Sequence, residues 1–489
     1  MSKLVTSAAM YGETENGALT YVTSCSKVLD LFGQGGSLRS RTVGEILTLV
    51  DKAYDEDPKK TLEVLFYLRD IRKGQGEKRT FREAIRHLFN TRRDNFKESQ
   101  EGLFDAIVEL GSWKDIFSIF NLEEYASYVK KHWNDKNSLL FKWAPSIGGS
   151  SNKTAENLAK YLNLTPRQYR KYLSSKRKEL KLVETSMCNK KWDEINYEAV
   201  PSRANLIYKE AFKKHDNERY LKFLSEVSKD NRSVKMNAGT LYPYEIVKKY
   251  LDVYDRFAWD EDDSIIKVDS SLEALWKNLP DYCNGSNSLV VADTSGSMTG
   301  LPMAVSFSLA IYFADRNKGL FADEFITFSR TPKFWHFDKG LSLAKKTKDM
   351  KDLNICENTD LQATFELMLK TAIANHLPES EMPKNIYVIS DMEFDYATRG
   401  VRSTFDRTNF EAIKDMYSEA GYKMPKLVFW NVNSRNDNLP VKADDSGAIL
   451  VSGCSPSIFQ MVIEGETDPY SFMVKTIDRY QAYVDRILK

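Results

Sequence analysis

Residues 289–298 have the sequence Leu289-Val290-Val291-Ala292-Asp293-Thr294-Ser295-Gly296-Ser297-Met298. An apolar, β-branched run of this kind is typical of a strand buried inside a parallel sheet. Asp293, Ser295 and Ser297 then fall on the loop at the strand's carboxyl end, where open α/β sheets bind their ligands. Carboxylate and hydroxyl oxygens are hard donors that suit Mg²⁺, and Gly296 allows the tight turn between the serines. The stretch therefore predicts an α/β domain with a cation site at one edge of its sheet.

The last third of the chain continues this pattern, because apolar runs alternate with stretches of helical spacing. Such alternation predicts a doubly wound, mostly parallel sheet. The expected strands are 288–293, 325–328, 333–336, 385–390, 426–431 and 448–452, and the expected helices are at about 302–315, 360–375 and 408–420.

The spacing Asp-x-Ser-x-Ser resembles the metal-ion-dependent adhesion site of von Willebrand factor A (vWA) domains. That family adds a threonine and a second aspartate from two later loops, and Thr359 and Asp391 match them in order. The resemblance implies that one Mg²⁺ ion, or Mn²⁺ or Ca²⁺ in its place, is held by Asp293, Ser295, Ser297, Thr359 and Asp391. It also implies an open coordination position for an acidic group of a partner. Taken alone, the Asp-Ser-Ser loop is equally consistent with a capped helix start.

Composition limits the class of protein. A chain of 489 residues with 42% hydrophobic residues is long enough for two to four globular domains. The net charge of +1 indicates no particular partner, no apolar run approaches the roughly 18 residues of a membrane span, and residues 1–4 do not begin a signal peptide. Five single cysteines argue against a zinc site and favour a reducing compartment. We expect a cytoplasmic protein without a membrane partner.

The sequence lacks the common catalytic motifs. It contains no nucleophile elbow, no His-Glu-x-x-His, no Walker A loop and no dinucleotide-binding fingerprint. The five histidines are scattered, and none is near the Asp-Ser-Ser loop in sequence. We therefore expect a binding protein and not an enzyme.

The amino-terminal part divides into an arm and a helical region. Residues 1–40 are rich in Gly, Ser and Thr, which is typical of a flexible terminus, and we expect an adaptable arm there. Apolar residues at helical spacing then predict helices from residue 41 to about 255.

A basic turn joins two of the expected helices. Gly74-Gln75-Gly76 lacks the preceding strand and the Gly-Lys-Ser/Thr end of a P-loop. Phosphate contact is one interpretation of its basic neighbours, and a solvated face is the other. These neighbours are Arg69, Arg72, Lys73, Lys78 and Arg79.

Residues 165–191 form a second basic stretch. Thr165 and Pro166 make a well-formed helix start, and nine basic residues oppose two acidic ones. Interleaved aromatics such as Tyr169 and Tyr172 favour contact with an RNA backbone and its unpaired bases. The alternative is an exposed helix whose tyrosines face the core. The candidate RNA-binding residues here are Arg167, Arg170, Lys171, Lys176, Arg177, Lys178 and Lys181.

Six motifs along the chain together resemble the DUF2828 family. They lie at 66–70, 74–77, 111–115, 142–146, 169–171 and 200–203. That family is similar in layout to the Ro/TROVE proteins, which pair an α-helical repeat ring with a vWA domain and bind small structured and misfolded RNAs. The resemblance implies HEAT-like helical repeats followed by a vWA-like domain, with structured or single-stranded RNA as the partner.

The expected fold class is α + α/β. The expected parts are a flexible arm at 1–40, an α-helical repeat domain at 41–255, an acidic junction at 256–285, a vWA-like domain at 286–465, and a C-terminal helix at 466–489 that packs back toward the helical domain. We expect an RNA- or ribonucleoprotein-binding protein with one divalent cation. The alternative is a protein-assembly scaffold that grips a partner carboxylate through the metal.

Overall fold

The chain forms two compact units in the computed structural model. Unit 1 comprises Met1–Val64 and Leu241–Arg479, and unit 2 comprises Leu65–Thr240 and Tyr480–Lys489. The structure describes residues 10–229, 234–256, 268–283, 287–328, 332–353, 359–395, 408–463 and 468–488. Much of the acidic junction expected at 256–285 lies outside these residues, and its described part belongs to unit 1.

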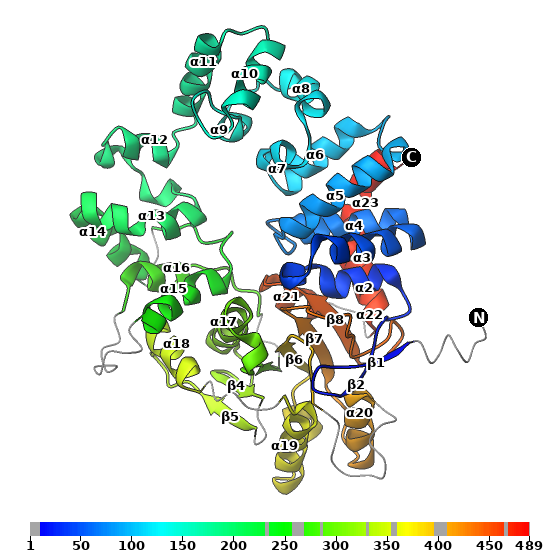
Figure 1. Cartoon of the computed structure of the whole chain (residues 1–489). Helices are drawn as coiled ribbons and strands as arrows, with labels where there is room; N and C mark the ends of the chain where they lie inside the picture. Colours follow the sequence, from blue (N-terminus) through cyan, green and yellow to red (C-terminus); the bar gives the residue numbers. More distant parts are fainter. Residues whose placement is uncertain are drawn as a thin grey trace. The chain divides into compact units, whose positions relative to one another are not determined.

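Unit 1 is built on a six-stranded sheet with the strand order β5-β4-β3-β6-β7-β8 (Figure 1). The strands are β3 (Ser288–Ala292), β4 (Glu324–Thr327), β5 (Lys333–His336), β6 (Asn385–Ser390), β7 (Lys426–Asn431) and β8 (Ala448–Ser452). β4 and β5 pair antiparallel, and the other neighbours pair parallel. With the helical region described below, this sheet confirms the α + α/β fold class.

Helices cover both faces of the sheet, which explains why its strands are continuous apolar runs. On β7, Trp430 contacts Phe459 of α21 (Ser457–Ile463), whereas the adjacent Phe429 contacts Phe410 of α20 (Asn409–Glu419). Phe313 of α17 (Leu301–Arg316) also contacts Phe459, so α17 and α21 share one face. The other helices of unit 1 are α2 (Lys27–Gly35), α3 (Val43–Glu56), α15 (Pro243–Arg256), α16 (Ser270–Lys277), α18 (Leu343–Asp352), α19 (Leu361–Ala374) and α22 (Pro469–Ile477), with 3₁₀ turns at Leu38–Ser40, Gly296–Met298, Glu379–Glu381 and Asp478–Tyr480.

The flexible arm expected over residues 1–40 is a wrong prediction from residue 10 onward. β1 (Tyr11–Glu13) and β2 (Leu19–Tyr21) form an antiparallel hairpin, and the α2 side chains Leu29 and Phe32 are fully buried. The glycines serve close packing: a Cβ on Gly36 would lie 2.6 Å from the backbone oxygen of Ser452 at the end of β8. A glycine-rich composition is common to flexible chains and to tight backbone approach, and the sequence alone does not separate the two.

The regular elements among the described residues of unit 2 are all helices or 3₁₀ turns (Figure 1). α4 (Pro58–Arg69) begins in unit 1 and ends in unit 2. The helices that follow are α5 (Arg79–Thr91), α6 (Gln100–Leu110), α7 (Trp113–Ile119), α8 (Leu122–Lys131), α9 (Leu140–Trp143), α10 (Asn152–Tyr161), α11 (Pro166–Glu179), α12 (Val183–Cys188), α13 (Ser202–His215) and α14 (Asn217–Ser228), with 3₁₀ turns at Arg93–Asn95, Trp192–Glu194 and Tyr197–Ala199.

The C-terminal tail is shared between the units. α22 packs on α2 and β8 of unit 1, and α23 (Gln481–Ile487) packs on α6 of unit 2. In unit 2 the Tyr480 hydroxyl donates to Asp70 Oδ2 at 3.0 Å, and Val484 and Ile487 are buried. The tail is therefore two short helices, where the sequence led us to expect one.

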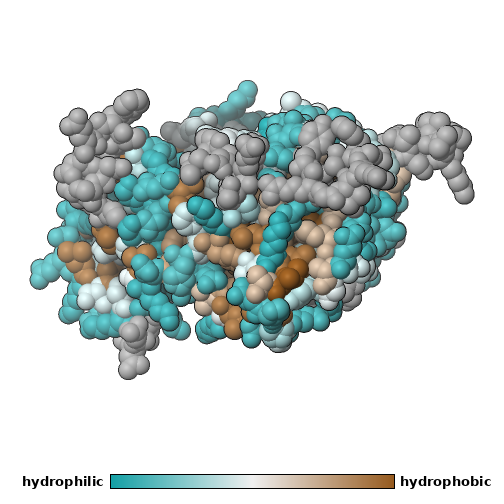
Figure 2. Space-filling view, turned by 90° about the horizontal axis from the view of Figure 1, so that it is seen from below, coloured by the Kyte–Doolittle hydropathy of each residue, from teal (hydrophilic) through white to brown (hydrophobic). Residues whose placement is uncertain are grey.

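The surface combines hydrophilic and hydrophobic residues. Seen from below, Figure 2 shows hydrophilic residues over much of the surface, with hydrophobic residues exposed in several places between them. Among the described residues, no helix is both long enough and apolar enough to cross a membrane.

Candidate metal centre and cationic helix face

The two candidate aspartates end neighbouring strands. β3 and β6 are parallel and in register, with Ala292 opposite Ile389, and Asp293 N donates to Ile389 O at 2.9 Å. Asp293 and Asp391 therefore leave the sheet at the same edge. Directly after Asp391, Met392 adopts a φ of 68°. A side-chain-bearing residue rarely takes this conformation, and such residues are concentrated at functional sites.

Asp293 is fully buried and carries an unfavourable charge. Its carboxylate accepts hydrogen bonds from Ser295 N at 2.9 Å and from Ser390 Oγ at 2.6 Å. Burial, and then the negative charge of Asp391, raise the pKa of Asp293 to about 6. A cation placed between the two carboxylates would favour their ionised forms.

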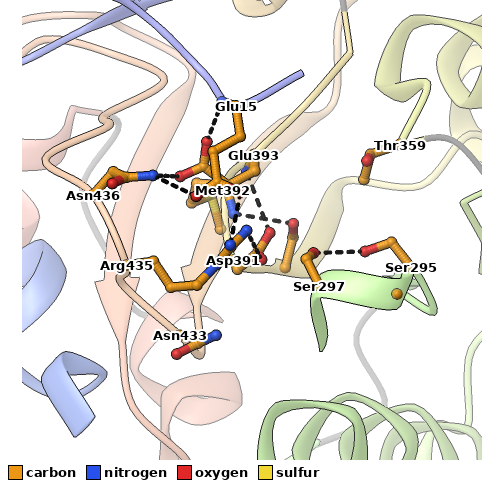
Figure 3. A network of polar contacts seen from close by, with 12 residues as sticks. Glu15, Ser295, Ser297, Thr359, Asp391, Met392, Glu393, Asn433, Arg435 and Asn436 are labelled. Carbon is orange, nitrogen blue, oxygen red and sulfur yellow. Dashed lines mark hydrogen bonds and ion pairs between the residues drawn. The ribbon is translucent and has the colours of Figure 1, made fainter. Parts of the chain in front are cut away.

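The hydroxyl candidates come from two loops. Ser295 Oγ lies 3.1 Å from Ser297 Oγ, and Ser295 is buried whereas Ser297 is exposed to solvent. Thr359 is buried just before α19, and its Oγ1 accepts from Asn16 Nδ2 at 3.1 Å. Asn16 Nδ2 also donates to Glu393 O at 2.6 Å, which ties Thr359 to the strand end that carries Asp391. Figure 3 shows Thr359, Ser295 and Ser297 on one side of Asp391.

This donor set fits a hard divalent cation. Two carboxylates and three hydroxyls offer only oxygen ligands, which Mg²⁺, Mn²⁺ and Ca²⁺ prefer. In the described part of the chain, no group of three or more His, Cys, Asp or Glu side chains could hold a metal, so the fit depends on the hydroxyls. The five residues predicted from the sequence gather at one sheet edge, and their binding of a metal stays a prediction.

Sequence reasoning missed a second polar group at this edge. Arg435 Nη2 donates to Asp391 Oδ2 at 3.0 Å, and Arg435 Nη1 donates to Glu15 Oε2 at 2.7 Å. Buried Glu393 accepts from Asn436 Nδ2 at 2.9 Å and from Asn438 Nδ2 at 2.8 Å. The polar run 433–438 comes shortly after the expected strand 426–431, and this position was the signal from which the group could have been predicted.

The basic residues of α11 divide into an exposed face and an inward set. Arg167, Arg170, Lys171 and Lys178 are exposed at helical spacing, and none of them forms an ion pair with another described residue. Arg177 points inward instead. Its guanidinium donates to Phe141 O at 2.7 Å, Ala144 O at 2.9 Å and Ser146 Oγ at 2.9 Å. These hydrogen bonds use the guanidinium within the fold, so Arg177 is structural, and burial lowers its pKa.

The tyrosines of α11 pack against the protein, as the alternative interpretation predicted. The rings of Tyr169 and Tyr172 stack on Trp133 at 5.5 and 5.4 Å between centroids. Their hydroxyls donate to Pro145 O and Trp133 O, both at 2.9 Å. One face of each ring is thus occupied by Trp133, and Tyr169 is fully buried whereas Tyr172 is half-buried.

The backbone of the basic turn at 74–76 is hydrogen-bonded to the C-terminal end of α4. The N–H groups of Gln75, Gly76 and Glu77 donate to the carbonyls of Tyr67, Asp70 and Leu68, respectively, at 3.1, 3.0 and 2.7 Å. These donors are therefore unavailable to a phosphate. Arg72, Lys73, Lys78 and Lys181 are exposed, and Arg79 and Lys176 are half-buried.

Comparison with known proteins identifies the family. The model of DUF2828, a domain of unknown function, matches residues 14–125 and 149–287, just over half of the chain. The model of DUF7788, also a domain of unknown function, matches residues 287–479. An uncharacterised protein of Acanthamoeba polyphaga mimivirus is 30% identical over 519 aligned positions, covering 96% of this chain and 87% of that protein. The chain belongs to the DUF2828 family.

A solved structure is also similar to this DUF2828 protein. The crystal structure of the Deinococcus radiodurans Ro (RSR) protein has 12% sequence identity and a TM-score of 0.38, covering 94% of this chain and 99% of that one. Likeness at this score carries no argument about function. The two family descriptions name no function either, so a function has to be argued from the residues.

Two of the motifs that resemble DUF2828, at 66–70 and 111–115, contribute to a buried ionic cluster in unit 2. Arg69 Nη2 donates to Asp115 Oδ2 at 2.6 Å, and Arg82 Nε donates to Asp115 Oδ1 at 2.8 Å. Arg69 and Asp115 are almost completely buried. A Cβ on Gly111 would lie 2.6 Å from Asp115 Oδ2, which explains the glycine. Arg69 is therefore not available to RNA, and its assignment as a contact residue is corrected.

Proposed function

We propose that this DUF2828 protein binds RNA through unit 2 and one divalent cation at the sheet edge of unit 1. The single observation that supports RNA binding is the exposed face of α11, with Arg167, Arg170, Lys171 and Lys178. Four cations on one face, without ion-pair partners among the described residues, are suited to phosphates spaced along a backbone. Base stacking is not part of the proposal, because the rings of Tyr169 and Tyr172 already stack on Trp133.

The test of RNA binding uses charge reversal on the full chain. We expect a labelled oligouridine to bind the wild type in a salt-dependent way, because each phosphate contact releases condensed counterions. Four contacts give a slope of log affinity against log salt near −3, at roughly −0.7 per contact. Replacing Arg167, Arg170, Lys171 and Lys178 with Glu should weaken binding and flatten the slope in fluorescence anisotropy. Arg177 is left unchanged, because its loss would disturb the fold.

A matched control removes the same charge elsewhere. Lys318, Lys339, Lys414 and Lys423 are exposed residues of unit 1, and their replacement with Glu changes the net charge equally. We expect this variant to keep the wild-type slope. Equal affinity and slope in the wild type and the α11 variant, or no RNA binding at low salt, would contradict the proposal.

A second candidate function is protein assembly through the cation. Ser297 is exposed beside the buried Asp293, so an ion at this edge would be open to solvent on one side. Ser295, Ser297 and Thr359 would bind the ion through hydroxyl oxygens, and Asp293 and Asp391 would neutralise its charge. The ion would supply one coordination position to a partner carboxylate. Calorimetry should show Mg²⁺ binding to the wild type and none to a folded Asp293→Ala variant.

A further inference from the structure

Arg435 links the candidate metal site to the N-terminal hairpin of unit 1. It lies on the loop after β7, and its guanidinium donates to Asp391 on one side and to Glu15 on the other. The two acids differ in exposure, because the Asp391 side chain is 1% exposed and that of Glu15 is 46% exposed. Figure 3 shows Asp391 between the serine loop and Arg435. One guanidinium is thus shared by an acid inside the site and an acid outside it.

A positive charge at this position acts against a divalent cation. An ion held by Asp391 would lie close to the guanidinium, and like charges at such a separation repel strongly in a partly buried site. The guanidinium would also occupy a lone pair of Asp391 Oδ2 that an ion could use. Arg435 Nε is buried and has no hydrogen-bond acceptor among the described residues, so the side chain is incompletely satisfied where it lies.

The hairpin turn that carries Glu15 is firmly attached to the same edge. Glu15 N donates to Glu393 Oε2 at 2.7 Å, and Thr14 Oγ1 donates to Phe394 O at 2.7 Å. Asn436 Nδ2 holds the Glu15 carboxylate through Oε1 at 3.0 Å. Glu15 therefore offers Arg435 a fixed acceptor that does not depend on Asp391.

We propose that Arg435 is an internal cation that competes with the divalent ion for Asp391. When the ion binds, the Arg435 guanidinium leaves Asp391 and pairs with Glu15 alone. The inference rests on the metal site of the proposed function. Ion binding moves the guanidinium from a position shared by two acids to one held by Glu15 alone. The N-terminal turn and the metal site are thereby coupled through a single side chain.

The test is Mg²⁺ titration of the full chain by calorimetry. Arg435→Gln removes the competing charge, and we expect it to bind Mg²⁺ at least about tenfold more tightly than the wild type. Glu15→Gln leaves Arg435 with Asp391 alone, and we expect it to bind about tenfold more weakly. In the double variant the Glu15 substitution should have no further effect, because Glu15 acts through Arg435.

Two controls separate this effect from a general loss of negative charge. Glu13→Gln changes an exposed acid on the same hairpin, and Asp437→Asn changes an exposed acid that pairs with Arg41 at 2.6 Å. Both should bind Mg²⁺ as the wild type does. If Arg435→Gln fails to fold, Glu15→Gln against these controls still decides the question.

The outcomes distinguish the inference from the metal site itself. Equal Mg²⁺ affinity in the wild type, Arg435→Gln and Glu15→Gln overturns the role of Arg435 and leaves the metal site standing. No Mg²⁺ binding by any of these proteins overturns both, while RNA binding is judged separately by its own titration.

Discussion

Asp293 carries an unfavourable charge, because it is fully buried and close to Asp391. Its pKa rises from the ordinary 3.8 to about 6, so the folded chain holds a proton there more tightly than the unfolded chain does. Stability without metal is therefore expected to fall as the pH rises from about 4 through 6, with the full cost present above 6. A bound cation would remove that cost.

The residue-scale prediction is that Asp293→Asn stabilises the metal-free protein at pH 7 by roughly 1–3 kcal/mol, because it removes a buried charge. The advantage should shrink as the pH falls through about 6, where wild-type Asp293 becomes protonated. Thermal unfolding between pH 5 and 7.5 measures it. Added Mg²⁺ should raise the melting temperature of the wild type and leave that of the variant unchanged. A variant that gains stability from Mg²⁺ as the wild type does would contradict the ligand role of Asp293.

At the scale of elements, the buried ionic cluster joins the end of α4 to the start of α7. Asp115 caps α7 by accepting from Ser112 N at 3.0 Å, and it also receives the guanidinium groups of Arg69 and Arg82. An ion pair of this kind contributes little net stability when intact. Removing one partner, however, leaves a buried charge without a counter-charge and is destabilising. Arg69 and Asp115, which lie in two of the motifs, are thus explained by packing within unit 2.

The element-scale prediction is that Asp115→Ala destabilises the protein by about 3–5 kcal/mol, because the buried Arg69 loses its counter-charge. Chemical denaturation of the full chain measures the loss. The control is Asp94→Ala, which removes an exposed acid from a surface pair with Lys97 and should change stability little. Equal stability of the two variants would show that the cluster is not needed for the fold.

At the scale of the whole molecule, the two candidate binding sites belong to different units. The cationic face of α11 is in unit 2, whereas Asp293, Asp391 and Arg435 are in unit 1. The two sites share no residue and no hydrogen bond among the described contacts. Their binding energies are therefore expected to be independent.

The whole-molecule prediction is that removing divalent cations with a chelator changes oligouridine affinity by less than roughly twofold. Anisotropy titrations at constant ionic strength, with Mg²⁺ or with chelator, measure this. Asp293→Ala should give the same result as the chelator. A large loss of RNA affinity in both cases would show that the metal site takes part in RNA binding.

The sequence by itself determined the sheet and the candidate ligands. The expected strands 385–390, 426–431 and 448–452 agree with β6, β7 and β8, and the helix expected at 302–315 differs from α17 by one residue at each end. These elements are predictable because a strand buried on both faces of a parallel sheet has a local sequence pattern. The pattern is a continuous apolar run followed by a polar loop. Asp293 and Asp391 could be chosen for the same reason, since each directly follows such a run.

Only the tertiary structure decided which charged residues are available. Arg69 and Asp115 are 46 positions apart, and Arg435 and Glu15 are 420 positions apart. A basic residue in a sequence has the same appearance whether it is solvated or paired with a distant acid, so periodicity and charge counts did not separate Arg177 from Lys178. Side-chain direction and long-range pairing are properties of the packed chain. Long-range pairing shows that Arg69 is a structural residue and not an RNA contact. It also places Arg435 beside Asp391.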